Sequence, residues 1–142
     1  RHQKSCFYSD HMIYSPAIPV FRADNGALLD NYYVASFITA PAVNAGVIRQ
    51  REPERVSEIY QVMAQRLEKV LWLAYQHHYT TLVLGAWGCG VFANDPKMIR
   101  TIFAELLGKQ SKFAAYFKHI TYAIYDTSAN QMVYQSFLDL SD

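Results

Sequence analysis

The chain has 142 residues, of which 51% are hydrophobic and 18% charged, so we expect a single packed domain rather than a disordered chain. The formal net charge of +1, from 13 basic and 12 acidic residues, excludes a protein that binds nucleic acid through a general basic surface. The two cysteines, Cys6 and Cys89, favour a reducing, cytoplasmic setting, and no apolar run is long enough to predict a membrane span.

The first part of the chain is predicted to be extended. Residues 12–21, MIYSPAIPVF, combine β-forming residues with two prolines, which cannot donate to a sheet ladder. We therefore expect an extended arm or an edge strand within residues 1–22. Residues 22–26, RADNG, have the composition of a tight turn. Residues 32–41, YYVASFITAP, are apolar almost throughout, which predicts a strand covered on both faces.

The longest helical pattern follows a loop that extends to about residue 52. Between residues 53 and 77, apolar residues recur at spacings of three and four, which places them on one face of a helix. Pro53 suits the first turn of this helix. The apolar face consists of Val56, Ile59, Tyr60, Met63, Leu67, Val70, Leu71 and Ala74.

A short buried strand is predicted over residues 80–87, TTLVLGAW, and it runs directly into a glycine-rich loop. The next helix is expected over residues 95–107, with Asn94 as its N-cap and Asp95 and Pro96 in its first turn. Its apolar residues again recur at helical spacing, and the glycine at position 108 ends the pattern.

The last part of the chain is predicted to contain a short helix at residues 112–117, a strand at 119–126 and a final helix that Ser128 caps. The order of elements is thus β, β, α, β, α, β, α. This alternation favours a three-layer α/β sandwich around a mainly parallel sheet, built by residues 1–142 as one domain.

The sequence GAWGCGVF forms the loop between the third strand and its helix. Ligands of open α/β sheets bind beyond the carboxyl ends of strands, and glycines let backbone N–H groups approach an anion. The spacing of Gly85, Gly88 and Gly90 differs from the dinucleotide motif, and no Lys-Ser or Lys-Thr pair follows as in a P-loop. We predict a phosphate or diphosphate cradle, and the rings of Trp87 and Phe92 suggest a nucleoside. A tight turn with packed rings is the alternative.

Cys89 suggests a different chemistry, because a thiol near a helix N-terminus can have a lowered pKa and act as a nucleophile. His11 is the base that such a Cys89-dependent hydrolase would use, and a space-filling role for the cysteine is the alternative. His77 and His78 are adjacent and point to different faces of a helix, so no metal site is predicted. We expect no cofactor.

Three blocks of the sequence carry a resemblance to a known family. They are YSDHMIYSPAIPVFRADNGALL, SFITAPAVNAG and LVLGAWGCGVFANDP, and they extend over residues 8–126. Together they resemble the microbial-type poly(ADP-ribose) glycohydrolases, bacterial enzymes whose catalytic domain is a macrodomain, and they occur in the family's order. The resemblance implies an α/β/α macrodomain-like sandwich with a mainly parallel or mixed sheet, whose N-terminal part is incomplete in this chain.

The resemblance also implies a ligand, because the family's glycine loop wraps the diphosphate of ADP-ribose. It assigns this role to Gly85, Ala86, Trp87, Gly88, Cys89, Gly90, Val91 and Phe92. The ring of Phe92 is expected to pack against the ligand. Thr39, Pro41 and Asn44, in the segment TAPAVN, are expected to line the pocket.

The family's catalytic signature, a triple glycine followed by Gln-Glu-Glu, does not occur in the 142 residues. Cleavage of the ribose–ribose bond requires a carboxylic acid that protonates the leaving oxygen. Asp10, Asp24 and Asp95 are not assigned this role, because they belong to an arm, a turn and the first turn of a helix. We predict no catalytic residue here and no glycohydrolase activity for the isolated chain.

The sequence begins at Arg1 without an initiator methionine, so we expect a C-terminal portion of a longer enzyme. The alternative is a shortened, non-catalytic module that binds ADP-ribose or poly(ADP-ribose). Loss of upstream strands leaves a sheet edge bare, and a bare edge favours pairing with another chain. We therefore expect a homodimer or pairing with a missing N-terminal segment, and neither DNA binding nor membrane association.

Overall fold

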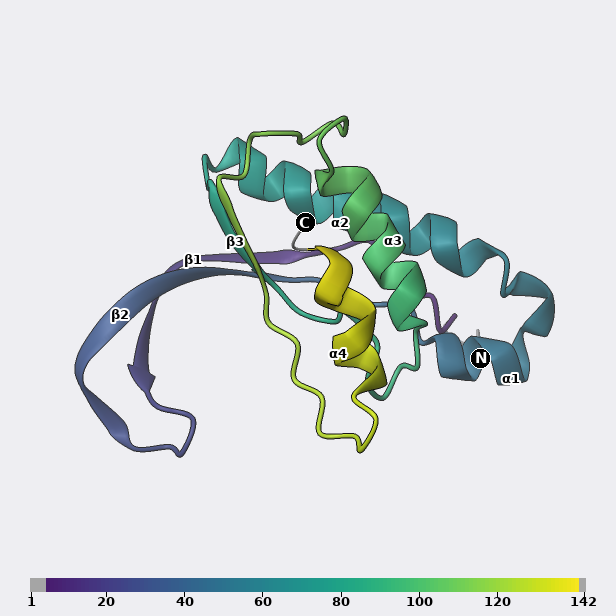
Figure 1. The fold of residues 1–142 in the computed structure, drawn as a ribbon, viewed down its shortest axis with the longest axis horizontal. Helices are drawn as coiled ribbons and strands as arrows, with labels where there is room; N and C mark the ends of the chain where they lie inside the picture. Colours follow the sequence, from purple (N-terminus) through teal and green to yellow (C-terminus); the bar gives the residue numbers. More distant parts are fainter. Residues whose placement is uncertain (1–4, 141–142) are drawn as a thin grey trace. The chain divides into compact units, whose positions relative to one another are not determined.

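The structure is a computed structural model that describes residues 5–140, except for the side chain of Asp139. The chain divides into two compact units. The smaller unit is Asp10–Pro41, and the larger unit combines residues 5–9 with residues 42–140. Figure 1 shows the helices and strands that belong to each unit.

The smaller unit is an antiparallel hairpin of β1 (Ile13–Arg22) and β2 (Leu28–Thr39). Pro16 lies where the register of the two strands shifts, a position at which a proline removes no ladder hydrogen bond. Gly26 has a φ of +84° and closes the turn between the strands. The predicted edge strand and the predicted turn are both present.

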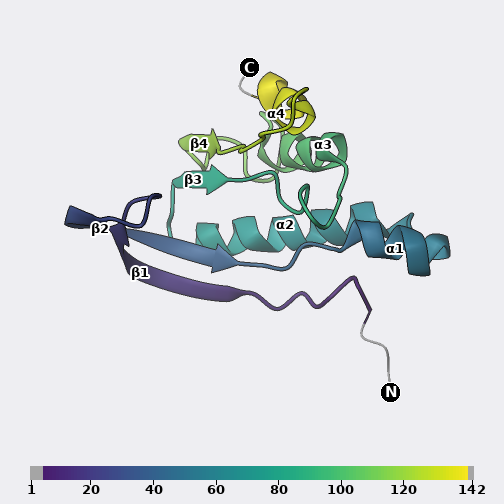
Figure 2. The same cartoon turned by 90° about the horizontal axis from the view of Figure 1, so that it is seen from below.

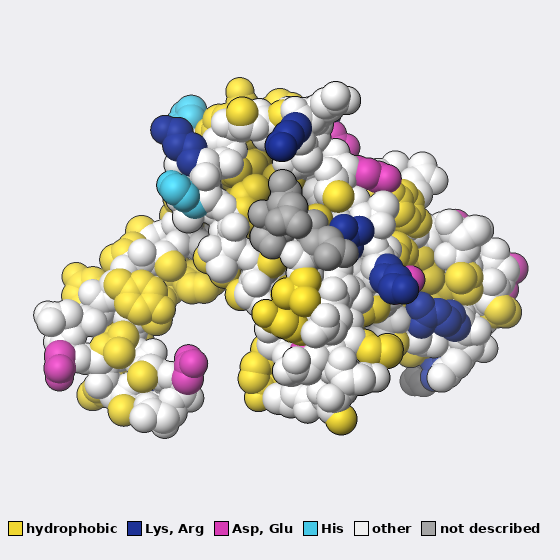
Figure 3. Space-filling view, in the orientation of Figure 1, with side chains coloured by type: hydrophobic (Ala, Val, Ile, Leu, Met, Phe, Trp, Pro, Cys, Tyr) yellow, Lys and Arg dark blue, Asp and Glu magenta, His cyan; other side chains and the backbone are white. Residues whose placement is uncertain are grey.

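The prediction that the second strand is covered on both faces is wrong. Tyr32, Tyr33 and Val34 point to alternate faces of β2, yet they are 67%, 59% and 56% exposed. Figure 3 shows apolar side chains over the surface of this hairpin. The physical reason is that β1 is the single sheet partner of β2 among the described residues, and a two-stranded ribbon has no core of its own.

In the larger unit, β3 (Thr81–Leu84) and β4 (His119–Tyr122) form a parallel pair. Figure 2 shows them side by side and pointing the same way. Alternate residues differ in burial, and Val83 on the outer face is 71% exposed. The strand predicted at residues 80–87 is therefore shorter than expected and covered on one face.

The helices of the larger unit form most of its core. They are α1 (Ala45–Arg51), η1 (Pro53–Arg55), α2 (Glu58–Gln76), α3 (Pro96–Leu107), α4 (Met132–Phe137) and η2 (Leu138–Leu140). The predicted apolar face of the long helix is largely confirmed, since Ile59, Met63, Leu67, Leu71 and Ala74 are buried. This face of α2 packs beside α3, which buries Ile99, Ile102 and Phe103.

A cluster of three rings connects α3, β4 and α4. The ring of Phe103 lies 5.5 Å from that of Tyr122 and 6.1 Å from that of Phe137. These contacts hold α4 beside the end of β4. Among residues 5–140, no helix is both long and apolar enough to cross a membrane.

The structure corrects several local predictions. Most of the loop expected before residue 52 is α1, which Asn44 caps by accepting a hydrogen bond from the N–H of Val47 at 3.2 Å. Residues 112–117 form turns rather than the predicted short helix, with Ala115 at a φ of +59°. Ser128 does not cap the last helix, because α4 begins after Gln131.

Candidate functional site

The glycine loop begins at the carboxyl end of β3 and ends at the start of α3. Because β3 and β4 are parallel, the segment that follows β4 leaves the sheet at the same edge. The N–H of Ala123 donates to the carbonyl of Leu84 at 2.8 Å, which keeps the two segments adjacent beyond the strands. This edge is where ligands of open α/β sheets bind.

Gly88 and Gly90 have different structural roles in the loop. Gly88 has a φ of +75°, and a Cβ there would lie 2.5 Å from Nδ2 of Asn94 and 2.7 Å from Cβ of Ala42. Only glycine fits this position without strain. At Gly90, a Cβ would meet no atom within 4 Å. Gly88 therefore keeps the loop compact, whereas Gly90 leaves space open for a ligand.

The buried side chain of Asn94 stabilises the loop through hydrogen bonds to backbone carbonyls. Its side chain is buried, and Nδ2 donates to the carbonyls of Val43 at 2.7 Å and Gly88 at 3.1 Å. Its backbone N–H also donates to the carbonyl of Gly88 at 3.0 Å. The prediction that Asn94 caps the following helix is wrong, because Asp95 takes that position and accepts from the N–H of Lys97.

Three consecutive backbone N–H groups of the loop are available to an anion. Within the described part of the chain, the N–H groups of Gly90, Val91 and Phe92 donate to no protein acceptor. The next N–H, that of Ala93, donates to the carbonyl of Gly90 at 2.9 Å and closes a turn. Successive free amides in a turn of this kind are typical of anion-binding concavities. The side chain of Val91 is 96% exposed and does not cover them.

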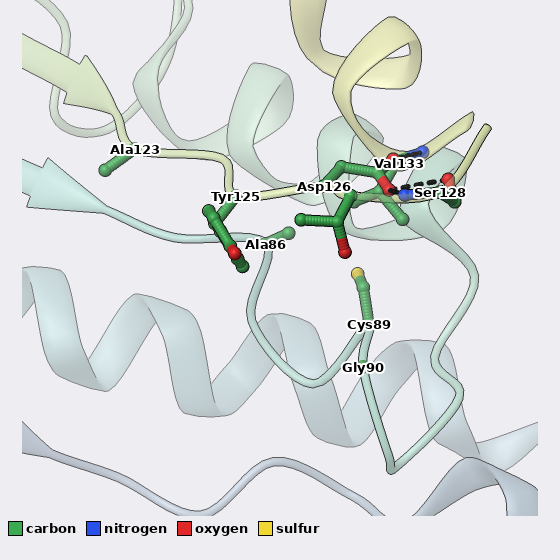
Figure 4. Close-up of a pocket in the computed structure, with 9 residues that line it drawn as sticks. Ala86, Cys89, Gly90, Ala123, Tyr125, Asp126, Ser128 and Val133 are labelled. Carbon is green, nitrogen blue, oxygen red and sulfur yellow. Dashed lines mark hydrogen bonds between the residues drawn. The ribbon is translucent and has the colours of Figure 1, made fainter. Parts of the chain in front are cut away.

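An open pocket of about 520 Å³ lies between the glycine loop and the segment after β4. Figure 4 shows Ala86, Cys89 and Gly90 on the side of the glycine loop. The residues of the opposite wall are Ala123, Tyr125, Asp126, Thr127, Ser128 and Val133. The sequence analysis missed this wall. The signal was present in the second parallel strand, because parallel neighbours end at the same edge of a sheet.

Tyr125 presents a flat apolar surface at the pocket, since its side chain is 90% exposed. A large ring that is held at a pocket and left uncovered is suited to stacking on a planar ligand. The loop itself carries the ring of Phe92, which is half-buried and stacks on Tyr8 with ring centroids 5.7 Å apart. Tyr125 is therefore the freer of the two rings.

Asp126 lines the pocket, and both oxygens of its carboxylate accept hydrogen bonds from the segment that follows it. One oxygen accepts from the N–H and the hydroxyl of Ser128 at 3.0 and 2.6 Å, and the other accepts from the N–H groups of Val133 and Tyr134 at 2.8 and 3.2 Å. The hydrogen bonds from Ser128 are the main reason that the pKa of Asp126 lies below its usual value. A carboxylate that stays ionised at neutral pH is unsuited to act as a general acid.

The thiol of Cys89 does not have the properties of a nucleophile. Its partial burial, with a smaller contribution from the negative charge of Asp95, raises the pKa of Cys89 from 9.0 to about 12. The Sγ atom lies 3.9 Å from the carbonyl of Trp87. The prediction of a lowered pKa at this position is wrong, because burial desolvates the thiol and the negative charge of Asp95 further disfavours a thiolate.

The remaining predicted site residues are divided between the two units. Thr39 ends β2, and Pro41 is the last residue of the smaller unit, whereas Asn44 belongs to the larger unit and caps α1. His11 also belongs to the smaller unit. Among the described residues, no group of three or more His, Cys, Asp or Glu side chains is arranged to hold a metal ion. The pocket-lining role of Thr39, Pro41 and Asn44 stays a prediction.

Solved structures of bacterial enzymes are similar to this chain over most of its length. A glutamate-to-alanine mutant of the poly(ADP-ribose) glycohydrolase of Thermomonospora curvata is 44% identical, with a TM-score of 0.88 over 94% of this chain and 50% of that chain. The enzyme of Deinococcus radiodurans in complex with ADP-ribose is 41% identical, with a TM-score of 0.89 over 94% of this chain and 53% of that chain. No protein-family model matches the chain, and no curated protein matches it.

The chain belongs to the family of bacterial poly(ADP-ribose) glycohydrolases. A further glycohydrolase structure from Thermomonospora curvata, bound to the inhibitor ADP-HPD, is 43% identical with a TM-score of 0.90. The expected α/β fold class is confirmed, with one antiparallel and one parallel strand pair among the described residues. The chain spans about half the length of these glycohydrolases, since it covers 50% to 53% of them.

Proposed function

We propose that this chain supplies the diphosphate-binding part of a poly(ADP-ribose) glycohydrolase-like, macrodomain-type site and binds ADP-ribose. The observation that carries the proposal is the row of N–H groups at Gly90, Val91 and Phe92, which find no acceptor among residues 5–140 and lie beside the space that Gly90 leaves open. The complex of the Deinococcus radiodurans enzyme with ADP-ribose supports the choice of ligand.

The geometry also supports an orientation for the ligand. We place the diphosphate on the amides of Gly90–Phe92, because these donors are free and the loop leads into the N-terminus of α3. The adenine ring then reaches the opposite wall, where Tyr125 offers an uncovered ring for stacking. Asp126 stays engaged with Ser128 and the start of α4, so its charge is partly compensated by hydrogen bonds.

Hydrolysis of poly(ADP-ribose) is the activity that we propose for the complete enzyme, with this chain as its C-terminal part. The 142 residues contain no Gln-Glu-Glu, and Asp126 is held ionised, so the described site has no carboxylic acid ready to protonate a leaving oxygen. We therefore propose that the isolated chain binds without cleaving. Release of ADP-ribose from poly(ADP-ribose) by the purified chain, absent from a Gly90→Val control, would contradict this.

Calorimetry with ADP-ribose tests the binding proposal directly. We expect a dissociation constant on the order of 100 µM or higher. The chain covers about half of the related glycohydrolase, and the entropy lost when the loop is ordered offsets the contacts with the ligand. Tyr125→Ala should weaken binding and leave the unfolding curve unchanged, since the ring is 90% exposed. Absence of any heat with millimolar ADP-ribose would remove the proposal.

Exposed apolar surface supports the further proposal that this chain pairs with another polypeptide. Val83 and the tyrosines of β2 are more than half exposed, and the β3–β4 pair leaves edges unpaired among the described residues. The partner is either a second copy or a segment equivalent to the remaining half of the relatives. Light scattering of the purified chain distinguishes them, because a homodimer has twice the monomer mass of 16.3 kDa. A strictly monomeric chain would contradict the homodimer and leave the equivalent of the remaining half as the partner.

A further inference from the structure

We propose that Tyr8 and Arg49 are positioning residues that hold the Phe92–Ala93 end of the glycine loop in its ligand-ready conformation. The proposal rests on the proposed binding of ADP-ribose. Neither residue is among those that line the pocket, so both act through the loop. Tyr8 stacks on the ring of Phe92, with an interplanar angle of 28°, and Arg49 Nη1 donates to the carbonyl of Ala93 at 2.8 Å.

Tyr8 can serve as a fixed support because the residues before it are anchored. The carbonyl of Cys6 accepts from the N–H of Asn44 at 3.0 Å, and the carbonyl of Phe7 accepts from Nη2 of Arg66 at 3.0 Å. The side chain of Phe7 is buried, and the guanidinium of Arg55 lies 4.3 Å from the centre of its ring. Tyr8 itself has a φ of +58°, a conformation that a residue with a Cβ keeps only when its surroundings enforce it.

The other side of the same loop end is held by α1. The N–H of Gly46 donates to the carbonyl of Phe92 at 3.0 Å, next to the hydrogen bond from Arg49. Ala93 has a φ of +52°, which is unfavourable for alanine. Phe92 and Ala93 are therefore held between the Tyr8 ring and two donors of α1, and Ala93 is held against its own backbone preference.

This support matters for binding because the last of the three free amides belongs to Phe92. If the loop end relaxes when a support is removed, the amides of Gly90–Phe92 no longer present a fixed surface, and a ligand must order them as it binds. The consequence is a weaker affinity for the diphosphate without loss of any atom that contacts it.

The test is calorimetry with ADP-ribose on the complete 142-residue chain. We expect Tyr8→Ala and Arg49→Ala each to weaken binding by roughly 3- to 10-fold, the range that corresponds to the loss of one aromatic pair or one hydrogen bond. Tyr8→Phe keeps the ring and should restore wild-type affinity. Arg51→Ala is the matched control on α1, because Arg51 is exposed and makes no contact with the loop in the described structure.

A double-mutant cycle separates positioning from general stability. Because Tyr8 acts through Phe92, Tyr8→Ala should add no further loss of affinity when Phe92→Ala is already present. In the ligand-free chain, the ¹⁵N order parameters of Val91, Phe92 and Ala93 should fall in Tyr8→Ala and recover in Tyr8→Phe. Wild-type affinity and unchanged order parameters in Tyr8→Ala would overturn the positioning role alone. A wild-type chain that binds no ADP-ribose would overturn the proposed function and, with it, this inference.

Discussion

Gly88 and Gly90 lie two residues apart, and their substitution by valine should have opposite consequences. Gly88→Val places a side chain at a φ of +75° and into Asn94 and Ala42, so it should lower the free energy of unfolding by roughly 2 kcal/mol or more. Gly90→Val meets open space, so the protein should keep its stability and lose at least about tenfold in ADP-ribose affinity, since each 1.4 kcal/mol is a factor of ten. Urea unfolding and calorimetry on both variants check this; equal stability losses would contradict it.

Cys89 should react slowly with alkylating reagents at neutral pH. Burial raises its pKa from 9.0 to about 12, so the folded protein favours the neutral thiol. The preference for the neutral thiol therefore stabilises the folded state fully below pH 9, and this stabilisation is lost as the pH rises from 9 through about 12. Iodoacetamide labelling, read by peptide mass mapping, should give a rate at Cys89 below that of a small free thiol at pH 7.5. A faster rate would restore the nucleophile hypothesis.

The two long helices and the glycine loop were predictable, because their signals are local, whereas the short helices α1 and α4 were missed or misplaced. Apolar spacing located α2 and α3, and the glycines located the turn between β3 and α3. The wall that includes Tyr125 was not predictable from local pattern, since it depends on which strand lies beside β3. The exposure of β2 was missed for a related reason, because the apolar sequence of a strand does not determine which segment covers it.

The short helix α4 depends on one carboxylate that precedes it. Asp126 accepts from Val133 and Tyr134 at the start of α4, so Asp126→Asn should lower stability at neutral pH. The pKa of Asp126 is lowered in the folded state, so its stabilisation is present above the unfolded value of 3.8 and is lost as the pH falls below it. Urea unfolding at pH 7 should separate wild type from Asp126→Asn, and the two curves should converge once the pH is low enough to protonate Asp126 in the folded protein. A constant difference at both pH values would contradict the capping role.

The molecule as a whole consists of a larger unit that has its own core and an open pocket, and a hairpin that exposes apolar side chains. The glycine loop, its support from α1 and residues 5–9, and the Tyr125 wall all belong to the larger unit. The family's catalytic signature is absent from the 142 residues, and the chain covers about half of each related glycohydrolase. The proposal therefore assigns diphosphate binding, without cleavage, to this chain.

The proposed function requires that the amides of Gly90, Val91 and Phe92 bind the diphosphate of ADP-ribose. Titration of the ¹⁵N-labelled chain with ADP-ribose, followed by ¹H–¹⁵N correlation spectra, observes these groups directly. These amide resonances should shift most, in the downfield direction expected of hydrogen bonds to phosphate, and Gly90→Val should abolish the shifts. Unchanged resonances at Gly90–Phe92, with the largest shifts elsewhere in the chain, would contradict it.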